Sequence, residues 1–219
     1  MTVATVVSVM DRGTWVSNTD VIVVVDPVGR RLLWVPRDVW CEPIAHRINK
    51  AFAVGGHEGL RTGLAALGIA VSHGLCLRRE ATEHALAGAV VTVPVQRPLR
   101  LWYPLEPTTR IEDGRKPVDF DPPAETLAGE RLHQWIGARY SRTGPSSDLD
   151  RIRRQQTLVR ALLRQRFPFG QALRDPALVR VSSDAALDDL RRVRSWWRFR
   201  YVGRLRPETI DGKMVLVPR

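Results

Sequence analysis

Three short stretches of this sequence combine carboxylates with arginines in a pattern that suits the binding of phosphate groups. The densest, residues 137–156, contains two aspartates, two glutamines and the arginines Arg139, Arg142, Arg151, Arg153 and Arg154. Guanidinium groups bind phosphate oxygens through paired, planar hydrogen bonds, so such a cluster is typical of an oxyanion site. We interpret it as half of a pyrophosphate-binding site. Residues 11–20 and the residues around Arg37 would supply the other half.

Within the densest stretch, the spacing places three polar side chains on one face of a helix. Asp148, Arg151 and Gln155 are three and four residues apart, with Arg154 slightly to the side. Two arginines of the preceding loop would reach toward the same face, Arg139 and Arg142. Leucines and an isoleucine occupy the opposite side, so the polar row is typical of a substrate-facing surface. The alternative is a solvated charged face.

Two aspartates stand at the ends of expected strands. Asp11 ends the first strand and Asp20 begins the second, so both carboxylates would meet at one edge of the sheet if the strands are neighbours. Two convergent carboxylates can hold a hard cation such as Mg²⁺, or alternatively Mn²⁺. The alternative is that each caps a turn, which is how we interpret Asp26 beside Pro27.

Arg37 and Asp38 follow an expected strand at its carboxyl end, where open α/β sheets place their ligands. Arg37 would bind a phosphate and Asp38 would orient that arginine. A surface ion pair is the alternative for an isolated Pro-Arg-Asp tripeptide.

The elements that must position these residues alternate between strands and helices. The patterns predict strands at residues 2–9, 21–25, 31–35, 70–77 and 90–93. They predict helices at residues 46–54, 58–67, 79–87, 127–138, 148–166 and 185–197, with a break at Gly55-Gly56. A small hairpin is expected at residues 202–218, around Asp211-Gly212. Residues 94–123 hold seven prolines and predict a long loop. The order favours one α/β or α+β domain.

The composition narrows the classes of molecule that the protein could bind. The net charge is +11 and only Lys50, Lys116 and Lys213 are lysines, so the basic residues are almost all arginine. This favours phosphate-bearing partners: nucleic acid, anionic lipid or a pyrophosphate substrate. Nucleic acid ranks last, because the basic residues are spread along the chain and no recognition motif is present. Trp196-Trp197 could stack bases, but we favour a core edge flanked by arginines.

The remaining features exclude several classes of protein. We expect Cys41 and Cys76 to be free thiols rather than a bridge, and we interpret the five histidines as structural or surface residues. No P-loop, dinucleotide fingerprint, zinc spacing or catalytic Ser-His-Asp order is present. No window is long and apolar enough for a transmembrane helix, and the N-terminus lacks the pattern of a signal peptide. We therefore expect a cytoplasmic protein, with association with the cell envelope as the alternative.

Taken together, the stretches resemble the LytR-CpsA-Psr family over about residues 6–166. Its members show a strand ending in a G-x-D-type motif and an S-D-T-type start to the next strand, similar to S-V-M-D at Asp11 and N-T-D-V at Asp20. Further matches are P-R-D at residues 36–38, I-N-x-A-F with a double glycine at 48–56, L-x-G-E at 127–130 and D-L-x-R-x-x-R-Q-Q at 148–156.

The resemblance implies a single three-layer α-β-α domain over residues 1–219, with a core at about 2–166, a central mixed sheet, and a helix and small hairpin at 183–219. It implies transfer of a glycosyl phosphate from a pyrophosphate donor, polyprenyl-linked or a sugar nucleotide, to an acceptor hydroxyl of the cell wall. Asp11 and Asp20 would hold Mg²⁺. The implied residues that bind the donor or act in catalysis are Arg37, Asp38, Asn49, Arg139, Arg142, Asp148, Arg151, Arg154 and Gln155.

The sequence also departs from the family pattern. An arginine usually found before the S-D-T element is absent, and Gly137 replaces one arginine of the usual R-x-R pair, for which Arg142 would substitute. Members of the family usually carry an N-terminal membrane anchor, which we expect this protein to lack. These departures leave two other activities open: hydrolysis of a pyrophosphate, or a binding module for pyrophosphate-linked lipids and glycans that has lost catalysis.

Overall fold

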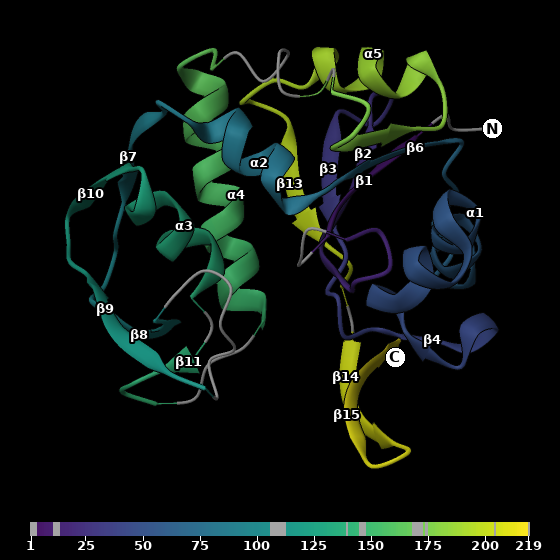
Figure 1. The fold of residues 1–219 in the computed structure, drawn as a ribbon, viewed down its shortest axis with the longest axis horizontal. Coiled ribbons are helices and arrows are strands. Elements are labelled where there is room, and N and C mark those ends of the chain that lie inside the picture. The colour runs from purple at the N-terminus through teal and green to yellow at the C-terminus, as the bar shows by residue number, and fades with distance from the viewer. Residues whose placement is uncertain are drawn as a thin grey trace. The chain divides into compact units, whose positions relative to one another are not determined.

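The computed structural model describes residues 4–10, 14–105, 113–138, 140–144, 148–167, 173, 175–203 and 205–218. Its internal contacts divide the chain into two compact units, which we call unit 1 (Met1–Ala85 with Pro168–Arg219) and unit 2 (Leu86–Phe167). Each unit has its own sheets and helices (Figure 1).

Unit 1 is built on a six-stranded mixed sheet with the strand order β12-β6-β1-β2-β3-β13. The strands are β1 (Thr5–Met10), β2 (Thr19–Asp26), β3 (Arg31–Trp34), β6 (His73–Leu77), β12 (Val179–Val181) and β13 (Arg198–Tyr201). β1 pairs antiparallel with β2 and parallel with β6, and β13 pairs parallel with β3. The β2–β3 pair is a hairpin closed by the predicted turn after Asp26.

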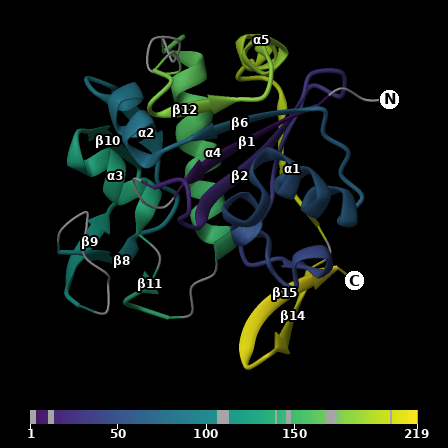
Figure 2. The ribbon, with the colours of Figure 1, turned by 45° about the vertical axis from the view of Figure 1, so that its right-hand side comes forward.

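Helices cover both faces of this sheet, namely α1 (Ala51–Ala66), α2 (Arg79–Leu86) and α5 (Asp184–Arg192). Alternate residues of β1 point to opposite faces, as in any strand. Val6 and Met10 belong to the core cluster that contains Leu64 of α1, whereas Val7 packs in the cluster that contains Leu187 of α5. Figure 2 shows α1 in front of β1 and β2. The predicted α/β class with a central mixed sheet is confirmed.

The predicted break in the first long helix is also confirmed. Within α1, Gly55 and Gly56 have non-helical backbone angles, and Gly56 has a φ of 58°. A positive φ of this kind costs little only for glycine, so the sequence can bend the helix here. A 3₁₀ turn, η2 (Ile48–Lys50), precedes α1 and contains the buried Asn49.

Unit 2 contains a two-stranded sheet, a three-stranded sheet and two helices. The elements are β7 (Val90–Pro94), β8 (Leu99–Pro104), β9 (Arg115–Phe120), β10 (Ala124–Ala128), β11 (Tyr140–Ser141), α3 (Glu130–Gly137) and α4 (Asp148–Arg164). β7 pairs with β10, and β8 lies between β11 and β9. Phe120 meets Trp135 of α3 edge to face with ring centroids 4.9 Å apart, which ties the three-stranded sheet to that helix.

The predicted loop over residues 94–123 is wrong, because β8 and β9 lie within it. Leu101 and Tyr103 of β8 are buried while their neighbours are less so, which is the alternation of a half-buried strand. The prolines obscured this pattern. Pro104 ends β8, and Pro117 lies on β9, an edge strand that tolerates a missing N–H donor.

Two helix boundaries differ from the sequence expectation. The helix expected from residue 127 begins at Glu130, because Leu127 and Ala128 complete β10. The helix expected to end at residue 197 ends at Arg192, and the alternating Arg-Phe-Arg-Tyr sequence of β13 follows it. The predicted C-terminal hairpin is confirmed as β14 (Leu205–Ile210) and β15 (Lys213–Pro218), which extends away from the six-stranded sheet in both ribbon views (Figures 1 and 2).

Cys41 and Cys76 are buried free thiols, as expected. Among the described residues, no helix combines the length and apolar character needed to cross a membrane.

Candidate functional site

In unit 1, the β2–β3 hairpin brings Asp20 beside Arg37. The Val35 N–H donates to the Ile22 carbonyl at 2.9 Å, so the chain leaving β3 runs back along the start of β2. Two residues beyond this bond on each strand, Arg37 Nη1 donates to Asp20 Oδ1 at 2.8 Å. The side chains are only 17% and 18% exposed, so the pair is largely sheltered from solvent.

Backbone hydrogen bonds hold the segment that contains Arg37. The successive carbonyls of residues 37–39 accept N–H bonds from Asn49 at 3.2 Å, Leu216 at 3.0 Å and Ile48 at 2.7 Å. Two of these donors lie on η2 and the third on β15. The position of Arg37 is therefore fixed by segments from both ends of the sequence.

Asp38 takes part in a second polar cluster beside this segment. Arg47 Nη1 lies 3.2 Å from Asp38 Oδ1, and Arg47 Nη2 donates to the Met214 carbonyl at 2.6 Å. Asn49 is 4% exposed, and its side-chain Oδ1 is buried without a hydrogen-bond partner. A buried amide oxygen in this state is unusual and leaves an acceptor available to a ligand.

The predicted cation site is only partly within the described residues. Asp20 lies at the start of β2, while Asp11 lies outside the part of the chain that the structure describes. Asn18, two residues before Asp20, has a buried Oδ1 without a hydrogen-bond partner among the described residues. Among the described residues, no group of three or more His, Cys, Asp or Glu side chains could hold a metal ion.

In unit 2, Asp148 and Arg151 of α4 meet as their spacing predicts. Arg151 Nε donates to Asp148 Oδ1 at 2.9 Å, and Arg151 Nη2 lies 2.7 Å from the same oxygen. Arg151 is 2% exposed, and Gln155 is also buried. A solvated charged face is therefore the wrong interpretation of these residues. It fits Arg153 instead, whose side chain is 62% exposed.

Within the described part of the chain, two polar atoms of this row have no hydrogen-bond partner. Asp148 Oδ2 and Gln155 Nε2 are both buried without a hydrogen bond. One is an acceptor and the other a donor, so the row offers both kinds of group beside a fixed guanidinium. Leaving such atoms unpaired is costly, and a bound polar ligand would remove that cost.

Arg154 is bonded to the end of α3. Its Nε donates to the Trp135 carbonyl at 3.0 Å and its Nη2 donates to the Ala138 carbonyl, while Trp135 Nε1 donates back to the Arg154 carbonyl at 2.9 Å. Burial, reinforced by the charge of Arg151, lowers the pKa of Arg154 to about 10. The prediction that Arg154 binds substrate stays a prediction.

The loop arginines differ in what the structure says of them. Arg142 Nη1 donates to Asp119 Oδ1 at 2.6 Å, and its guanidinium carbon lies 5.5 Å from the centre of the Trp102 ring. Its backbone N–H donates to the Arg100 carbonyl at 2.7 Å, which extends the pairing of β11 with β8. Arg139 lies outside the described residues.

A comparison with protein-family models matches residues 6–187 to the LytR_cpsA_psr family. The chain belongs to this family. Members of the LytR_cpsA_psr family are cell-wall glycopolymer transferases, which supports an enzyme of that general kind. No curated protein matches the chain.

Solved structures share the fold of this LytR_cpsA_psr protein. Protein gbs0355 from Streptococcus agalactiae has a TM-score of 0.72 at 15% identity, over 99% of this chain and 82% of its own. A structure of TagT bound to LI-WTA has a TM-score of 0.67 at 17% identity, covering 99% of this chain and 84% of the other. TagU from B. subtilis has a TM-score of 0.60 at 17% identity, covering 99% and 90%.

Sequence reasoning missed two residues at these positions. Arg47 escaped because its contacts depend on the fold: its backbone acceptor, Met214, is 167 residues away. Asn18 directly precedes the Thr-Asp pair that resembles the LytR_cpsA_psr motif, so its place in the motif was the available signal.

Proposed function

We propose that this LytR_cpsA_psr protein is a phosphotransferase. It would transfer a glycosyl phosphate from a pyrophosphate donor, linked to a polyprenol or a nucleotide, to an acceptor hydroxyl of the cell wall, and the polyprenyl phosphate or nucleoside monophosphate would leave. Family membership supports this proposal, and the family is associated with the cell envelope. So does the likeness to TagT, whose structure holds LI-WTA. The observation that carries the proposal is the buried Arg151–Asp148 pair beside the unpartnered amide of Gln155.

The chemistry of phosphoryl transfer explains why such a row would matter. The reaction needs charge on the spectator oxygens to be neutralised and the acceptor to be held in line. Arg151 would supply a fixed positive charge, because Asp148 Oδ1 holds its guanidinium. Gln155 Nε2 would donate to a phosphate oxygen. The second oxygen of Asp148 would accept the proton or hydrogen bond of the acceptor hydroxyl. Arg139, Arg142 and Arg154 would add further donors.

Unit 1, taken by itself, has residues suited to a cation site and an arginine suited to phosphate. Asp20, Asp11 and Asn18 offer the hard oxygen ligands that Mg²⁺ or Mn²⁺ prefers, and the unpartnered Oδ1 of Asn18 fits such a ligand set. The ion, when bound, would withdraw charge from phosphate oxygens. Arg37 would bind a phosphate oxygen, Asp38 would orient the segment through Arg47, and Asn49 would offer its free side-chain oxygen to substrate.

The test compares three variants in one assay. The protein is incubated with a pyrophosphate donor and Mg²⁺ or Mn²⁺, and release and transfer of phosphate are both measured. Arg151→Ala and Asp20→Ala should each lose activity by about 10²-fold or more. Arg153→Ala is the matched control, because Arg153 forms the same kind of i,i+3 pair on the same helix but is exposed. Equal activity in all the proteins would reject the proposal.

The two other activities have distinct outcomes in the same experiment. Release of phosphate without transfer, lost in Arg151→Ala, would identify a pyrophosphate hydrolase. Calorimetric binding of the donor without turnover in either cation would identify a binding module. The departures at Gly137 and residues 16–18 are the observations that favour the binding module.

A further inference from the structure

Exposed basic and apolar side chains gather at the end of unit 1 that carries the β2–β3 turn. Arg30 lies over the ring of Trp196, with 5.3 Å between its guanidinium carbon and the ring centre. The Arg198 N–H donates to the Arg30 carbonyl at 3.0 Å, which fixes the start of β13 beside the turn. Trp196 is 64% exposed and Val28, in the turn, is 75% exposed. We call Val28, Arg30, Arg194, Trp196 and Arg198 the Trp196 patch.

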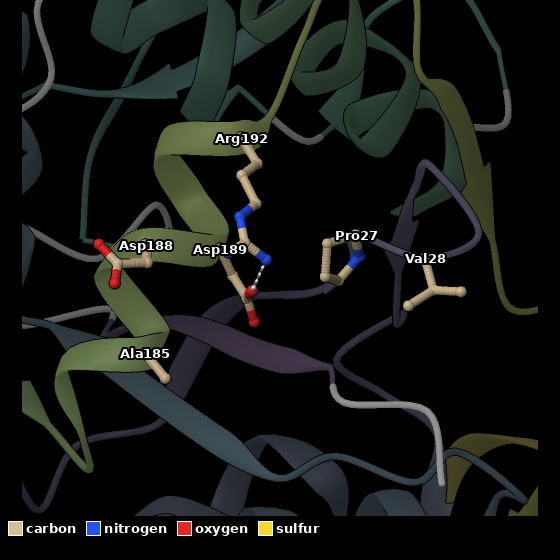
Figure 3. Close-up of a pocket in the computed structure, with 6 residues that line it drawn as sticks. All are labelled: Pro27, Val28, Ala185, Asp188, Asp189 and Arg192. Carbon is tan, nitrogen blue, oxygen red and sulfur yellow. Dashed lines mark ion pairs between the residues drawn. The ribbon is translucent and has the colours of Figure 1, made fainter.

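The C-terminal end of α5 borders this patch. Figure 3 shows Pro27 and Val28 of the turn and Asp188, Asp189 and Arg192 of α5 around one hollow. Arg194 lies two residues beyond the end of α5 and donates to the carbonyls of residues 191 and 193. The turn, the end of α5 and the start of β13 therefore form one continuous end of unit 1.

The arginines of the patch lack acidic partners. Within the described residues, Arg30, Arg194 and Arg198 have no carboxylate at ion-pair distance. Neighbouring arginines do: Arg31 lies 2.8 Å from Asp26, and Arg191 lies 2.7 Å from Asp188. The patch is therefore a local excess of positive charge, beyond the general excess of the chain.

The patch is separate from the candidate site of unit 1. Asp20 lies at the start of β2 and Asp26 at its end, six residues further on. At a rise of about 3.3 Å per residue, the two ends of the strand are roughly 20 Å apart. The Asp20–Arg37 pair is at one end, and Arg30 follows the turn at the other. The proposed transfer reaction therefore does not account for these residues.

The surroundings of Trp196 favour a lipid surface over a nucleic acid or a sugar as the partner. Trp197 is 5% exposed, so no two-tryptophan platform for bases exists, and Arg30 covers a face of the remaining ring. A partner that must stack on the indole, whether a base or a sugar, would have to displace Arg30. A lipid headgroup region makes no such demand. It accepts an indole edge and an apolar side chain while anionic headgroups pair with the surrounding guanidinium groups.

We propose that the Trp196 patch docks unit 1 on the surface of an anionic lipid bilayer. Val28 and Trp196 enter the headgroup layer, and Arg30, Arg194 and Arg198 bind anionic headgroups. This inference is independent of the proposed catalytic function.

Vesicle flotation of the full chain tests the proposal. Vesicles of phosphatidylcholine alone are compared with vesicles containing one third phosphatidylglycerol, at low and physiological salt. The double variant Arg30→Gln/Arg198→Gln should lower the partition coefficient for the anionic vesicles on the order of 20-fold. The control Arg164→Gln/Arg206→Gln removes the same charge from exposed arginines elsewhere and should lower it by less than about threefold, through the general field alone.

A second pair of variants tests the apolar contribution to vesicle binding. Trp196→Ser should weaken binding, whereas Met214→Ser, at a residue that is 71% exposed on the hairpin, should not. Brominated lipids should quench part of the tryptophan fluorescence of the wild type, and Trp196→Phe should remove that part. Thermal melting confirms that each variant is folded.

Several outcomes would overturn the proposal. Equal loss in the two double variants would show that net charge alone drives binding. Failure of the wild type to float with anionic vesicles would reject docking outright. Binding of a single-stranded oligonucleotide that depends on Arg30 and Arg198, with vesicle binding unchanged in their absence, would assign the patch to nucleic acid instead.

Discussion

Arg37 donates a hydrogen bond to Asp20 over 2.8 Å, and this contact joins the residues just beyond the paired parts of β2 and β3. The same two strands carry a second ion pair at their other end, where Arg31 Nε lies 2.8 Å from Asp26 Oδ2. The two pairs have the same length but different surroundings. Asp26 also accepts the Gly29 N–H at 2.8 Å and is 5% exposed, so it closes the turn. The Asp20 side chain is 18% exposed and lies two residues after Asn18, where the preceding loop ends, whereas its partner Arg37 is less exposed than Arg31.

The two pairs should therefore respond oppositely to the loss of their arginine. Arg37→Gln should lower kcat/KM for the proposed transfer by about 10²-fold, because it removes a donor to phosphate. Its stability should fall by less than that of Arg31→Gln, because the Asp20 carboxylate that loses its partner is 18% exposed, whereas the Asp26 carboxylate is 6% exposed. Arg31→Gln should leave activity intact and lower stability by about 1–2 kcal/mol, because Asp26 stays buried. Kinetics and urea unfolding of both variants check this, and the reverse assignment would contradict it.

We expect Arg154 to contribute mainly to the stability of the fold. Arg154→Met removes the donors to the Trp135 and Ala138 carbonyls, which are buried at the end of α3. We expect a loss of about 2–4 kcal/mol in the free energy of unfolding. Arg153→Met, one residue away and exposed, should cost less than about 1 kcal/mol. Urea unfolding followed by circular dichroism measures both. Equal stability of the two variants would show that the bonds to α3 contribute nothing.

How much of the fold could be read from the sequence depended on how local the signal was. The first hairpin, the glycine break in α1 and the helix from Asp148 each follow from a few adjacent residues, and all were predicted. The strands β12 and β13 are three and four residues long and gain their stability from pairing with β6 and β3. Such short segments carry too little pattern to predict, because non-local partners determine them.

The candidate site also combines features that the sequence predicted with features that it did not. The i,i+3 spacing predicted that Asp148 and Arg151 share a helix face, and Asp20 and Arg37 were assigned to the same half of the site, but their direct contact was not predicted. Burial was not predictable: Arg151 and Arg154 resemble Arg153 in sequence, yet only Arg153 is exposed. The bonds from Leu216 and Arg47 to Asp38 and Met214 connect the two ends of the chain, and no local pattern encodes them.

Two glycines of α1 should differ sharply in their tolerance of alanine. A Cβ on Gly59 would lie 2.2 Å from the Ala51 carbonyl oxygen, a backbone atom that cannot move without shifting the helix. A Cβ on Gly55 would meet nothing within 4 Å. Gly59→Ala should therefore lower stability by about 3 kcal/mol or more, and Gly55→Ala by less than about 1 kcal/mol. Thermal unfolding of the two variants tests this prediction. Equal melting temperatures would show that α1 adjusts freely around its kink.

Stability should fall in mild acid because of His57. Burial lowers the pKa of His57 below 6.5, while the unfolded chain restores the ordinary value. Between the two values the unfolded state binds more protons than the folded state, so stability is fully present above pH 6.5 and decreases as the pH falls through and below it. His57→Gln should flatten this part of the profile. Urea unfolding at several pH values from neutral to mildly acidic measures the slope, and identical slopes in the two proteins would refute the assignment.

Arg47 should act on the proposed reaction through Asp38 without touching substrate. Its guanidinium links Asp38 to the Met214 carbonyl, and three backbone bonds hold the same segment, so its loss should loosen Arg37 only partly. We expect Arg47→Ala to lower kcat by about tenfold and Arg47→Lys to recover part of it, since lysine keeps the charge but not the fork of donors. Arg206→Ala, on the β14–β15 hairpin that also carries Met214, is the control and should leave kcat unchanged.

A double-mutant cycle separates this positioning role from general loosening of the hairpin. If Arg47 acts through Asp38, Arg47→Ala should have no further effect on kcat once Asp38 is replaced by alanine. Additive losses would mean that Arg47 acts by another route, through Met214 and the hairpin alone. The distinction matters for the whole segment, because the Asp38 backbone carbonyl also accepts a hydrogen bond from the Leu216 N–H. Additivity would therefore assign the effect to the hairpin, and non-additivity to the side chain that stands next to Arg37.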